Sequence, residues 1–338
     1  MTEKHTAAIL GAGTWGIALA RMLINAGKEI TVWSALPEEL KVLKETRRHP
    51  KLPQADLPDT ICYEADLEEA CKNKEIIIFA VPSVYVRSTA RAAAPYLNAE
   101  QIIVDVAKGI EADTLMTLTE VIRDELKDPA IPLVALSGPT HAEEVACDMP
   151  TTITAASADM DAARVIQNFF TTPFMRVYTN SDVKGVELCG AMKNIIALAA
   201  GISDGLGYGD NAKAALITRG LAELARLGRC MNCDYTTFSG LAGMGDLIVT
   251  CTSRHSRNHN CGYLIGTGVA PDAAVKQVGM VVEGLYALPA AMRLSEHYQV
   301  DLPIIQAVND IVEGKAAARD CLSRLFGREP KSEREFLE

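Results

Sequence analysis

The glycine-rich stretch GAGTWG, from Gly11 to Gly16, constrains the fold more than any other feature of the chain. It follows the apolar run AAIL (7–10) and opens the helical pattern IALARMLINAG (17–27). In a strand–turn–helix unit, Gly11 allows the tight turn, Gly13 lets a pyrophosphate approach the backbone, and Gly16 lets the helix pack closely on the strand. The helix N-terminus adds amide donors and positive potential. The turn therefore predicts a dinucleotide-binding domain.

Short apolar runs alternate with helical patterns along the first half of the chain, which is typical of a doubly wound α/β sheet with parallel strands. The predicted strands are AAIL (7–10), EITVW (29–33), EIIIFAV (75–81), QIIVDV (101–106), PLVAL (132–136), TTITAAS (151–157) and FMRVY (174–178). After Ser181 we expect only helices, such as NAKAALITRGLAELARLG (211–228), with Asp210 as its N-cap and Gly228 just after its end. The sequence thus predicts a Rossmann-type domain over residues 1–181 and an all-helical substrate domain over 182–338, with REPKSEREFLE (328–338) as a solvated tail.

The net charge of −10 and nine irregularly spaced cysteines limit the partners and the location of the protein. A negative chain is poorly suited to nucleic acid or an anionic membrane as its main partner. Cysteines without the density of a disulfide scaffold indicate reduced thiols and a cytoplasmic protein. The uncharged stretch 6–20 carries the glycine turn, so we expect mature structure rather than a signal peptide. No uninterrupted apolar run reaches the roughly 18 residues that span a bilayer, and we expect no membrane insertion.

The end of the second predicted strand bears on the choice of cofactor. A carboxylate there would accept hydrogen bonds from the ribose of NAD and repel the 2′-phosphate of NADP. The residue after Trp33 is Ser34, and Glu38 and Glu39 come only later. Basic residues follow at Lys41, Lys44, Arg47 and Arg48. This pattern favours NADP, with NAD tolerated.

Residues 188–201, LCGAMKNIIALAAG, place Lys193 within an otherwise apolar stretch of small residues. The composition favours a helix, in which the neighbours three and four positions from Lys193 are apolar or small. A lysine on that face either extends to solvent or lies partly desolvated, where its ammonium loses a proton more readily. Lys193 is therefore a candidate acid/base.

Two further segments suit a small phosphorylated substrate. LAGMGDLIVTCTS (241–253) places Asp246 after two glycines and before an apolar run. The motif SRN offers Ser256, Arg257 and Asn258 in succession. A guanidinium can bind a phosphate through two parallel hydrogen bonds, with the hydroxyl and the amide as neutral donors. Taken singly, Asp246 could be a turn residue and Arg257 a surface charge.

Together these motifs resemble an ordered set found in bacterial NAD(P)-dependent glycerol-3-phosphate dehydrogenases. The set comprises GAGTWG, AKGIE (107–111), SGPTHAEE (137–144), GAMKN (190–194), GMGDL (243–247), SRN and VVEG (281–284), and it spans nearly the whole chain. The resemblance implies the reversible reduction of dihydroxyacetone phosphate to sn-glycerol 3-phosphate, at the entry to glycerophospholipid biosynthesis. It further implies a cytoplasmic homodimer that uses NADP, the preferred cofactor, or NAD.

The resemblance also implies roles for the residues at matching positions. Lys193 would be the catalytic acid/base, with Asn194, Asp246 and Thr250 around the reacting oxygen. The implied substrate site comprises Lys108, Gly138, Thr140, Lys193, Asp246, Ser256, Arg257 and Asn258. The implied cofactor contacts are Gly11, Gly13, Thr14, Trp15, Gly16, Ser34, Lys108, Ala142, Arg257, Val281 and Glu283. His259 replaces an arginine that often follows SRN in the family, so we expect part of the charge there to depend on pH.

Three alternatives remain open. The 3-hydroxyisobutyrate and 6-phosphogluconate dehydrogenases share the two-domain plan and a Lys–Asn pair on a helix, but would favour carboxylate substrates. A non-catalytic NADP-sensing module would bind the cofactor without oxidising it. A metal site could use Cys251, His255, His259 and Cys261, or Cys230 and Cys233. We expect no metal, because the first set overlaps the phosphate segment and the second supplies only two ligands.

Overall fold

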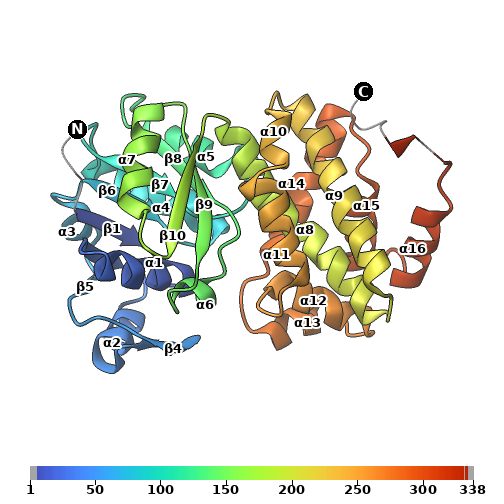
Figure 1. The fold of residues 1–338 in the computed structure, drawn as a ribbon, viewed down its shortest axis with the longest axis horizontal. Coiled ribbons are helices and arrows are strands. Elements are labelled where there is room, and N and C mark those ends of the chain that lie inside the picture. The colour runs from blue at the N-terminus through green and yellow to red at the C-terminus, as the bar shows by residue number, and fades with distance from the viewer. Residues whose placement is uncertain (1–5, 331, 334–338) are drawn as a thin grey trace. The chain divides into compact units, whose positions relative to one another are not determined.

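The computed structural model of the protein describes residues 6–330 and 332–333, and the chain forms two compact units (Figure 1). Unit 1 comprises the residues up to Lys108 together with Met116–Val183. Unit 2 comprises Gly109–Leu115 together with the chain from Lys184 onward. Most of the predicted C-terminal tail lies outside the described residues.

The sequence predicts a continuous first domain over residues 1–181, but one short segment of that range belongs to unit 2. Gly109–Leu115 clusters with unit 2, although it lies within the range 1–181. Ile110 packs in the apolar core of unit 2, and Arg293 donates a hydrogen bond to the carbonyl oxygen of Ala112. Burial of one apolar side chain and one backbone hydrogen bond therefore fix this loop to the second unit.

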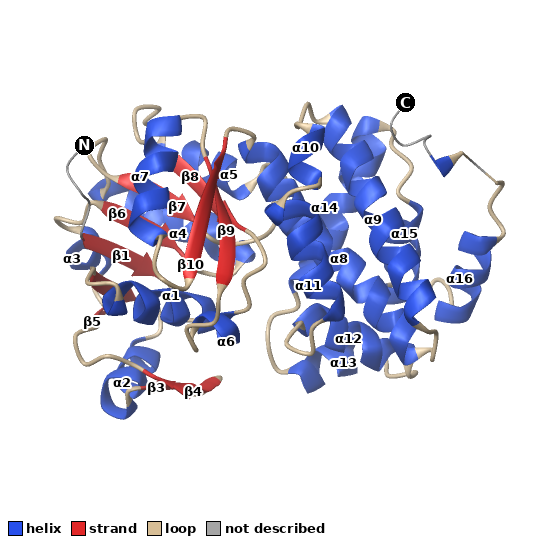
Figure 2. Ribbon diagram, in the orientation of Figure 1, coloured by secondary structure: helices blue, strands red, loops and turns tan. Residues whose placement is uncertain are grey.

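An eight-stranded sheet forms the centre of unit 1 (Figure 2). Its strands are β1 (Thr6–Leu10), β2 (Glu29–Trp33), β5 (Cys62–Glu64), β6 (Ile76–Phe79), β7 (Ile102–Asp105), β8 (Leu133–Ser137), β9 (Thr151–Ala156) and β10 (Met175–Asn180), in the spatial order β10-β9-β8-β7-β6-β1-β2-β5. Every predicted strand is present. The sequence did not predict β5 or the hairpin of β3 (Arg48–His49) and β4 (Leu52–Asp56), because these strands are short and carry many polar residues.

One pairing departs from the expected parallel sheet. Strands β8 and β9 are antiparallel, whereas every other pair in this sheet is parallel. A parallel pair needs a crossover that returns the chain to the starting edge, usually along a full helix. The connection from β8 to β9 contains only the four-residue helix α6 (Ala142–Val145), so β9 enters from the opposite direction.

Helices cover both faces of the sheet, which explains why its strands are continuous apolar runs. Along β1, Ala7 and Ile9 face one apolar core while Ala8 and Leu10 face the other, as the two-residue period of a strand requires. The first core includes α1 (Thr14–Asn25), α2 (Pro37–Thr46) and α7 (Met160–Phe170), and the second includes α3 (Leu67–Cys71), α4 (Val86–Ala93) and α5 (Leu118–Leu126), with 3₁₀ turns at Ser83–Tyr85 and Ala94–Tyr96. The doubly wound α/β prediction is confirmed.

The part of unit 2 from Lys184 that the structure describes is helical throughout. Its elements are α8 (Val183–Gly205), α9 (Asp210–Cys230), α10 (Tyr235–Phe238), the π-helical turn η3 (Leu241–Gly245), α11 (Asp246–Thr252), α12 (Arg257–Gly266), α13 (Pro271–Val278), α14 (Glu283–Tyr298), α15 (Pro303–Val312) and α16 (Ala318–Phe326). Helix α8 is long and apolar enough to cross a membrane, yet that stretch is wholly buried in the protein. It forms the central helix of this unit's core.

The two predicted caps of α9 are wrong. Its N-cap is Gly209, and Asp210 is already its first helical residue. Gly228 does not end the helix, which continues to Cys230. A Cβ atom on Gly228 would lie 2.1 Å from the Phe238 ring, so this glycine allows an aromatic side chain to pack on the helix.

Four glycines allow α8 and α12 to touch backbone to backbone. A Cβ atom added at Gly201, Gly205, Gly262 or Gly266 would lie between 2.0 and 2.3 Å from a backbone oxygen of the other helix. On each helix the two glycines are four positions apart and share one face. Side chains that carry a Cβ would hold the helices farther apart, so this contact requires all four glycines.

We expect Gly262→Ala to destabilise the protein by about 3 kcal/mol or more, because its methyl group would lie 2.2 Å from the Leu198 carbonyl oxygen. The urea midpoint of unfolding measures this effect. Gly209→Ser is the control, since a Cβ there would meet nothing within 4 Å and serine suits the N-cap position of α9. A Gly262→Ala protein with the midpoint of the control would show that α8 and α12 can separate without cost.

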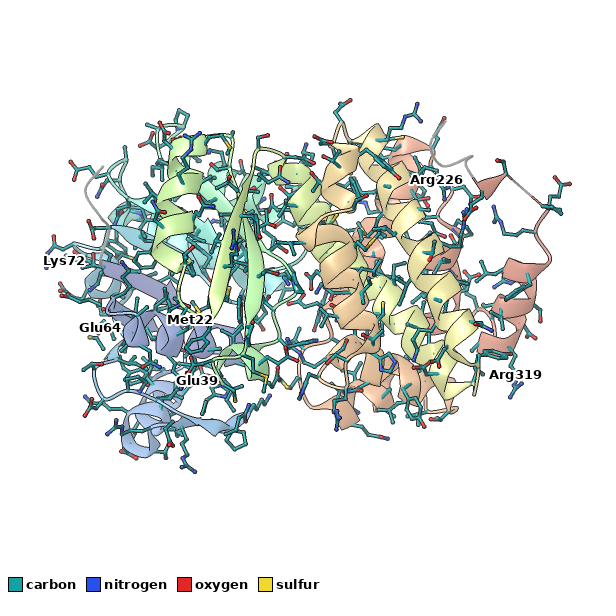
Figure 3. All side chains as sticks on the ribbon, in the orientation of Figure 1. Met22, Glu39, Glu64, Lys72, Arg226 and Arg319 are labelled. Carbon is teal, nitrogen blue, oxygen red and sulfur yellow. The ribbon has the colours of Figure 1, made fainter. Side chains whose placement is uncertain are left out.

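Glu223 on α9 is a buried carboxylate that holds the start of α15. It accepts hydrogen bonds from the backbone N–H groups of Ile304 at 2.7 Å and Ile305 at 3.2 Å. Burial raises the pKa of Glu223 to about 7, against the lowering effect of these two donors. Arg226, labelled in Figure 3, donates instead to the carbonyl oxygen of Asp301.

Between pH 4.5 and about 7 the folded protein binds a proton at Glu223 that the unfolded chain releases, so this residue makes stability fall as pH rises. Relative to Glu223→Gln, the wild type should lose about 3 kcal/mol of its free energy of unfolding above pH 7. Urea unfolding at several pH values measures this loss. Glu296→Gln, at an exposed glutamate, is the control and should keep the wild-type pH profile. Parallel profiles for wild type and Glu223→Gln would contradict the assignment.

Candidate active site

The glycine turn between β1 and α1 lies where the strand order of the sheet reverses. Strand β1 is flanked by β2 and β6, and ligands of such sheets bind outside the carboxyl ends of the strands at this point. Gly11 has φ +128°, and a Cβ there would lie 2.6 Å from the Ala80 carbonyl oxygen after β6. A Cβ on Gly16 would lie 2.1 Å from the Gly11 carbonyl oxygen. Only glycine fits at either position.

Gly13 presents open backbone at the start of α1. It is exposed, and a Cβ there would meet nothing within 4 Å. This helix has no side-chain cap and no acidic residue in its first turn, which holds buried Thr14 and half-buried Trp15. Exposed backbone amides and a positive helix end suit a pyrophosphate, so these residues fit a dinucleotide.

A carboxylate lies near the end of β2, although no acidic residue follows Trp33 directly in the sequence. Ser34 donates a hydrogen bond from its Oγ to Glu39 Oε2 at 2.8 Å, and the same Oγ accepts one from the Leu36 N–H at 3.2 Å. Glu39 belongs to the first turn of α2. The residue after Trp33 is a serine, and helix α2 brings an acidic side chain into contact with it.

Lys108, Gly138 and Thr140 meet at one carbonyl group. Lys108 Nζ donates to the Gly138 oxygen at 3.0 Å and Thr140 Oγ1 donates to it at 3.1 Å. These residues follow β7 and β8, which run parallel to β1 through β6, so they lie at the same edge of the sheet as the glycine turn. Ala142 starts α6, which contacts α1.

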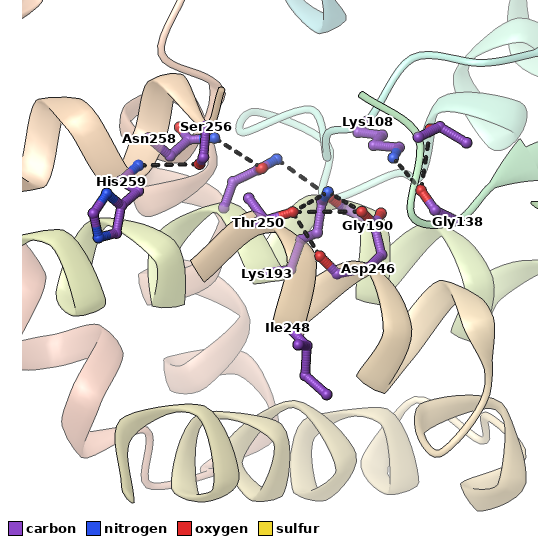
Figure 4. Close-up of polar contacts among 12 residues, drawn as sticks. Lys108, Gly138, Gly190, Lys193, Asp246, Ile248, Thr250, Ser256, Asn258 and His259 are labelled. Carbon is purple, nitrogen blue, oxygen red and sulfur yellow. Dashed lines mark hydrogen bonds and ion pairs between the residues drawn. The ribbon is translucent and has the colours of Figure 1, made fainter. Parts of the chain in front are cut away.

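Lys193 lies in a buried polar cluster formed by α8 and α11 (Figure 4). The residue is only 6% exposed, so its side chain does not extend into bulk solvent. Its Nζ forms an ion pair with Asp246 Oδ1 and donates to Thr250 Oγ1 at 2.7 Å. Thr250 in turn donates to the main-chain oxygen of Asp246 at 2.6 Å, one helical turn back. The desolvated alternative for Lys193 is therefore the correct one.

The π-helical turn η3 sets the position of Asp246. A Cβ on Gly243 within this turn would lie 2.1 Å from the Phe238 carbonyl oxygen, so η3 packs directly on the end of α10. Helix α11 then starts at Asp246, which is 1% exposed. Both charged groups are buried, so the ion pair between them stabilises the Lys193 ammonium and the Asp246 carboxylate alike.

Asn194 and Asn258 form a buried chain of amides that reaches the start of α14. Asn258 Nδ2 donates to Asn194 Oδ1 at 2.9 Å, and Asn258 Oδ1 accepts from the Gly284 N–H at 2.8 Å. Glu283 is the first residue of α14, and Val281 precedes it by two positions. The Gly284 amide is a partner that the sequence analysis missed, although it belongs to the VVEG motif.

Ser256 and Arg257 open α12. Ser256 is the N-cap, and its Oγ accepts a hydrogen bond from the His259 N–H at 3.2 Å. Arg257 is half-buried and forms no ion pair with any residue that the structure describes. A guanidinium at the N-terminus of a helix is well placed to bind a phosphate.

The ring of His259 faces a carboxylate, and the pH-dependent charge expected at this position stays a prediction. Its ring Nε2 lies 2.8 Å from Asp204 Oδ2, and Lys213 Nζ lies 2.8 Å from the same oxygen. The imidazole thus contacts a carboxylate on α8.

The thiols of Cys251 and Cys261 near this site are buried. Burial raises the pKa of the Cys251 thiol to about 12 and that of Cys261 to about 11, so both stay protonated at neutral pH. Across the described ranges, no group of three or more His, Cys, Asp or Glu residues is arranged to hold a metal ion. The nine cysteines form no disulfide.

Both halves of the chain match known families. Residues 6–163 match the model of the NAD-dependent glycerol-3-phosphate dehydrogenase N-terminus, and residues 182–323 match that of the C-terminus. Glycerol-3-phosphate dehydrogenase (NAD(P)+) 2 of Lactobacillus delbrueckii subsp. bulgaricus is 59% identical over 329 residues, which cover 96% of this chain and 98% of the relative. The Bacillus subtilis glycerol-3-phosphate dehydrogenase (NAD(P)+) is 46% identical over 331 residues, covering 97% and 96%. The crystal structure of glycerol-3-phosphate dehydrogenase from Coxiella burnetii gives a TM-score of 0.92 at 36% identity, covering 96% and 99%.

Proposed function

Because the chain belongs to the NAD-dependent glycerol-3-phosphate dehydrogenase family, we propose that it catalyses the reversible, NAD(P)-dependent reduction of dihydroxyacetone phosphate to sn-glycerol 3-phosphate. The observation that carries this proposal is the buried cluster of Lys193, Asp246 and Thr250, which is suited to acid/base chemistry on a carbonyl oxygen. The family match over both halves favours this reaction over a hydroxy-acid dehydrogenase or a non-catalytic NADP sensor.

Lys193 is the proton donor in this proposal. Reduction of a ketone adds a hydride to the carbonyl carbon and a proton to its oxygen, and bound NAD(P)H supplies the hydride. Lys193 Nζ gives its proton to the C2 oxygen and takes it back in the reverse direction, an effect worth a factor of about 10² to 10⁴. Asp246 and Thr250 hold Nζ in one orientation, and Asn194 is the next residue on the same helix.

The substrate phosphate does not react, but its binding positions C2 for reaction. Arg257 at the start of α12 would hold this phosphate. The other proposed substrate contacts are Lys108, Gly138, Thr140, Lys193, Asp246, Ser256 and Asn258. Asn258 can take this role only through an amide already tied to Asn194 and Gly284, which restricts its orientation.

The cofactor would be held by the glycine turn and the sheet edge beside it. The proposed contacts are Gly11, Gly13, Thr14, Trp15, Gly16, Ser34, Lys108, Ala142, Arg257, Val281 and Glu283. The relatives are named for both NAD and NADP, and the preference for NADP stays a prediction. The homodimer, the cytoplasmic location and the place at the entry to glycerophospholipid biosynthesis stay predictions as well.

The purified protein should oxidise NADPH or NADH only when dihydroxyacetone phosphate is present, and Lys193→Met should lower that rate by a factor of about 10² or more. The loss of nicotinamide absorbance measures both rates. Activity of Lys193→Met near the wild-type level would remove this lysine from the mechanism, and a wild type that prefers carboxylate substrates would favour the hydroxy-acid reading.

Folding of the variant needs its own control. Lys193→Met leaves the Asp246 carboxylate buried without its cation, which costs about 3–5 kcal/mol. The double variant K193M/D246N removes both charges and should recover stability without recovering activity.

We expect Arg257→Ala to raise the KM for dihydroxyacetone phosphate and to lower kcat, with a loss of about 10²-fold in kcat/KM, because the phosphate loses a charged bidentate partner. Reduction of dihydroxyacetone, which lacks the phosphate, should be equally slow in wild type and variant. Arg254→Ala, at an exposed arginine three positions earlier, serves as the control. If the variant lost activity equally toward both substrates, Arg257 would not be the phosphate ligand.

A further inference from the structure

The contact between Ser34 and Glu39 places a carboxylate at the carboxyl end of β2. Ser34 is buried, and its Oγ both donates to Glu39 and accepts from the Leu36 N–H. Glu39, labelled in Figure 3, is half-buried in the first turn of α2. Its Oε2 accepts the hydrogen bond from the serine hydroxyl, so the two side chains hold each other in place.

This position matters for any dinucleotide that the glycine turn binds. In such folds the residue at the end of the second strand lies beside the adenosine ribose, where NAD has a 2′-hydroxyl and NADP has a 2′-phosphate. A carboxylate accepts a hydrogen bond from the hydroxyl. It repels the phosphate, which carries about −1.5 to −2 charges at neutral pH.

Two of the basic residues that favoured NADP in the sequence are held by acidic partners. Arg48 lies 2.9 Å from Asp56, and Arg47 lies 3.7 Å from Asp59. Each of these exposed ion pairs offsets part of the arginine charge. Less positive charge is therefore free to bind a phosphate at this edge than the basic residues of the sequence suggest.

The other groups near Glu39 are His49, the lysine Lys51 that acts on the same ring, and the charged residues of α2. His49 is buried, and burial lowers its pKa although Glu39 acts to raise it, so the ring is neutral at pH 7. Lys41 and Lys44 are exposed farther along α2 and form no ion pair with Glu39 in the described part of the chain. Glu38 adds a second negative charge in the first turn, which opposes the positive end of the helix.

We propose that Glu39 selects between the two cofactors: its carboxylate, held by Ser34 at the end of β2, favours the 2′-hydroxyl of NADH and disfavours the 2′-phosphate of NADPH. This inference rests on the proposed function only in taking the ligand to be a nicotinamide dinucleotide. It opposes the preference for NADP that the residues after Trp33 predict, and the wild-type ratio decides between the two.

Glu39→Gln tests the charge without removing the contact, because glutamine keeps an oxygen that can accept from Ser34. The Kd values for NADPH and NADH come from quenching of tryptophan fluorescence, since both tryptophans, Trp15 and Trp33, lie in the cofactor half of the chain. We expect the affinity for NADPH relative to NADH to rise about tenfold in the variant. The ratio of kcat/KM values with dihydroxyacetone phosphate should rise by a similar factor.

Two controls separate charge from structure. Glu38→Gln removes an exposed carboxylate from the same helical turn and should leave the ratio within about twofold of wild type. Added salt should raise the NADPH-to-NADH affinity ratio of wild type and change that of Glu39→Gln less, because salt screens only a charge that is present. A purely structural role for Glu39 would not make the salt dependence of the affinity ratio differ between wild type and Glu39→Gln.

The outcomes distinguish this inference from the proposed function. A protein that binds both cofactors but never reduces dihydroxyacetone phosphate contradicts the proposed function, and the Kd ratios still decide the role of Glu39. An unchanged Kd ratio in Glu39→Gln, in protein with wild-type thermal stability, overturns the inference. If that variant is less stable, Glu39→Ala is measured in its place against the same criterion.

Discussion

Backbone contact between α8 and α12 is the constraint on which the second unit depends. The two helices touch at four glycines, which have no Cβ atom: Gly201 and Gly205 on α8, and Gly262 and Gly266 on α12. The start of α12 is thereby fixed against the middle of α8, where Asn258 reaches Asn194. The arginine and the lysine that we propose to bind the phosphate and to donate the proton need fixed spacing to act on one small substrate, and rigid helix packing provides it.

Burial gives the polar cluster around Lys193 its chemical character. An ammonium and a carboxylate that are both removed from water are held by each other and by Thr250, so neither can turn away without a large cost. The neighbouring Cys251 thiol stays protonated and adds no competing charge. The proposed proton donor is therefore positioned before any substrate arrives, which lowers the reorganisation that the proposed reaction requires.

Much of the fold could be predicted because its signals are local. The central strands of unit 1, such as β1, β6 and β7, are buried on both faces, so they appear as apolar runs, and the glycine turn appears as a motif between a strand and a helix. The antiparallel step between β8 and β9 was not predictable in this way, because strand direction depends on the path of the connection. Gly228 resembles a helix end in sequence, but it is a packing site for Phe238, a residue ten positions away.

The amino-acid sequence alone shows which kinds of groups are present: a glycine turn for a dinucleotide, one lysine in an apolar helix, and an arginine after a serine. Which of these groups meet depends on tertiary packing. In the folded protein Lys193 contacts Asp246, and Asn258 contacts the Gly284 amide. His259 contacts Asp204, and Glu39 contacts Ser34. Charge and hydrogen-bonding capacity belong to each residue, whereas distance and desolvation belong to the packed chain, and the chemistry of the site requires both.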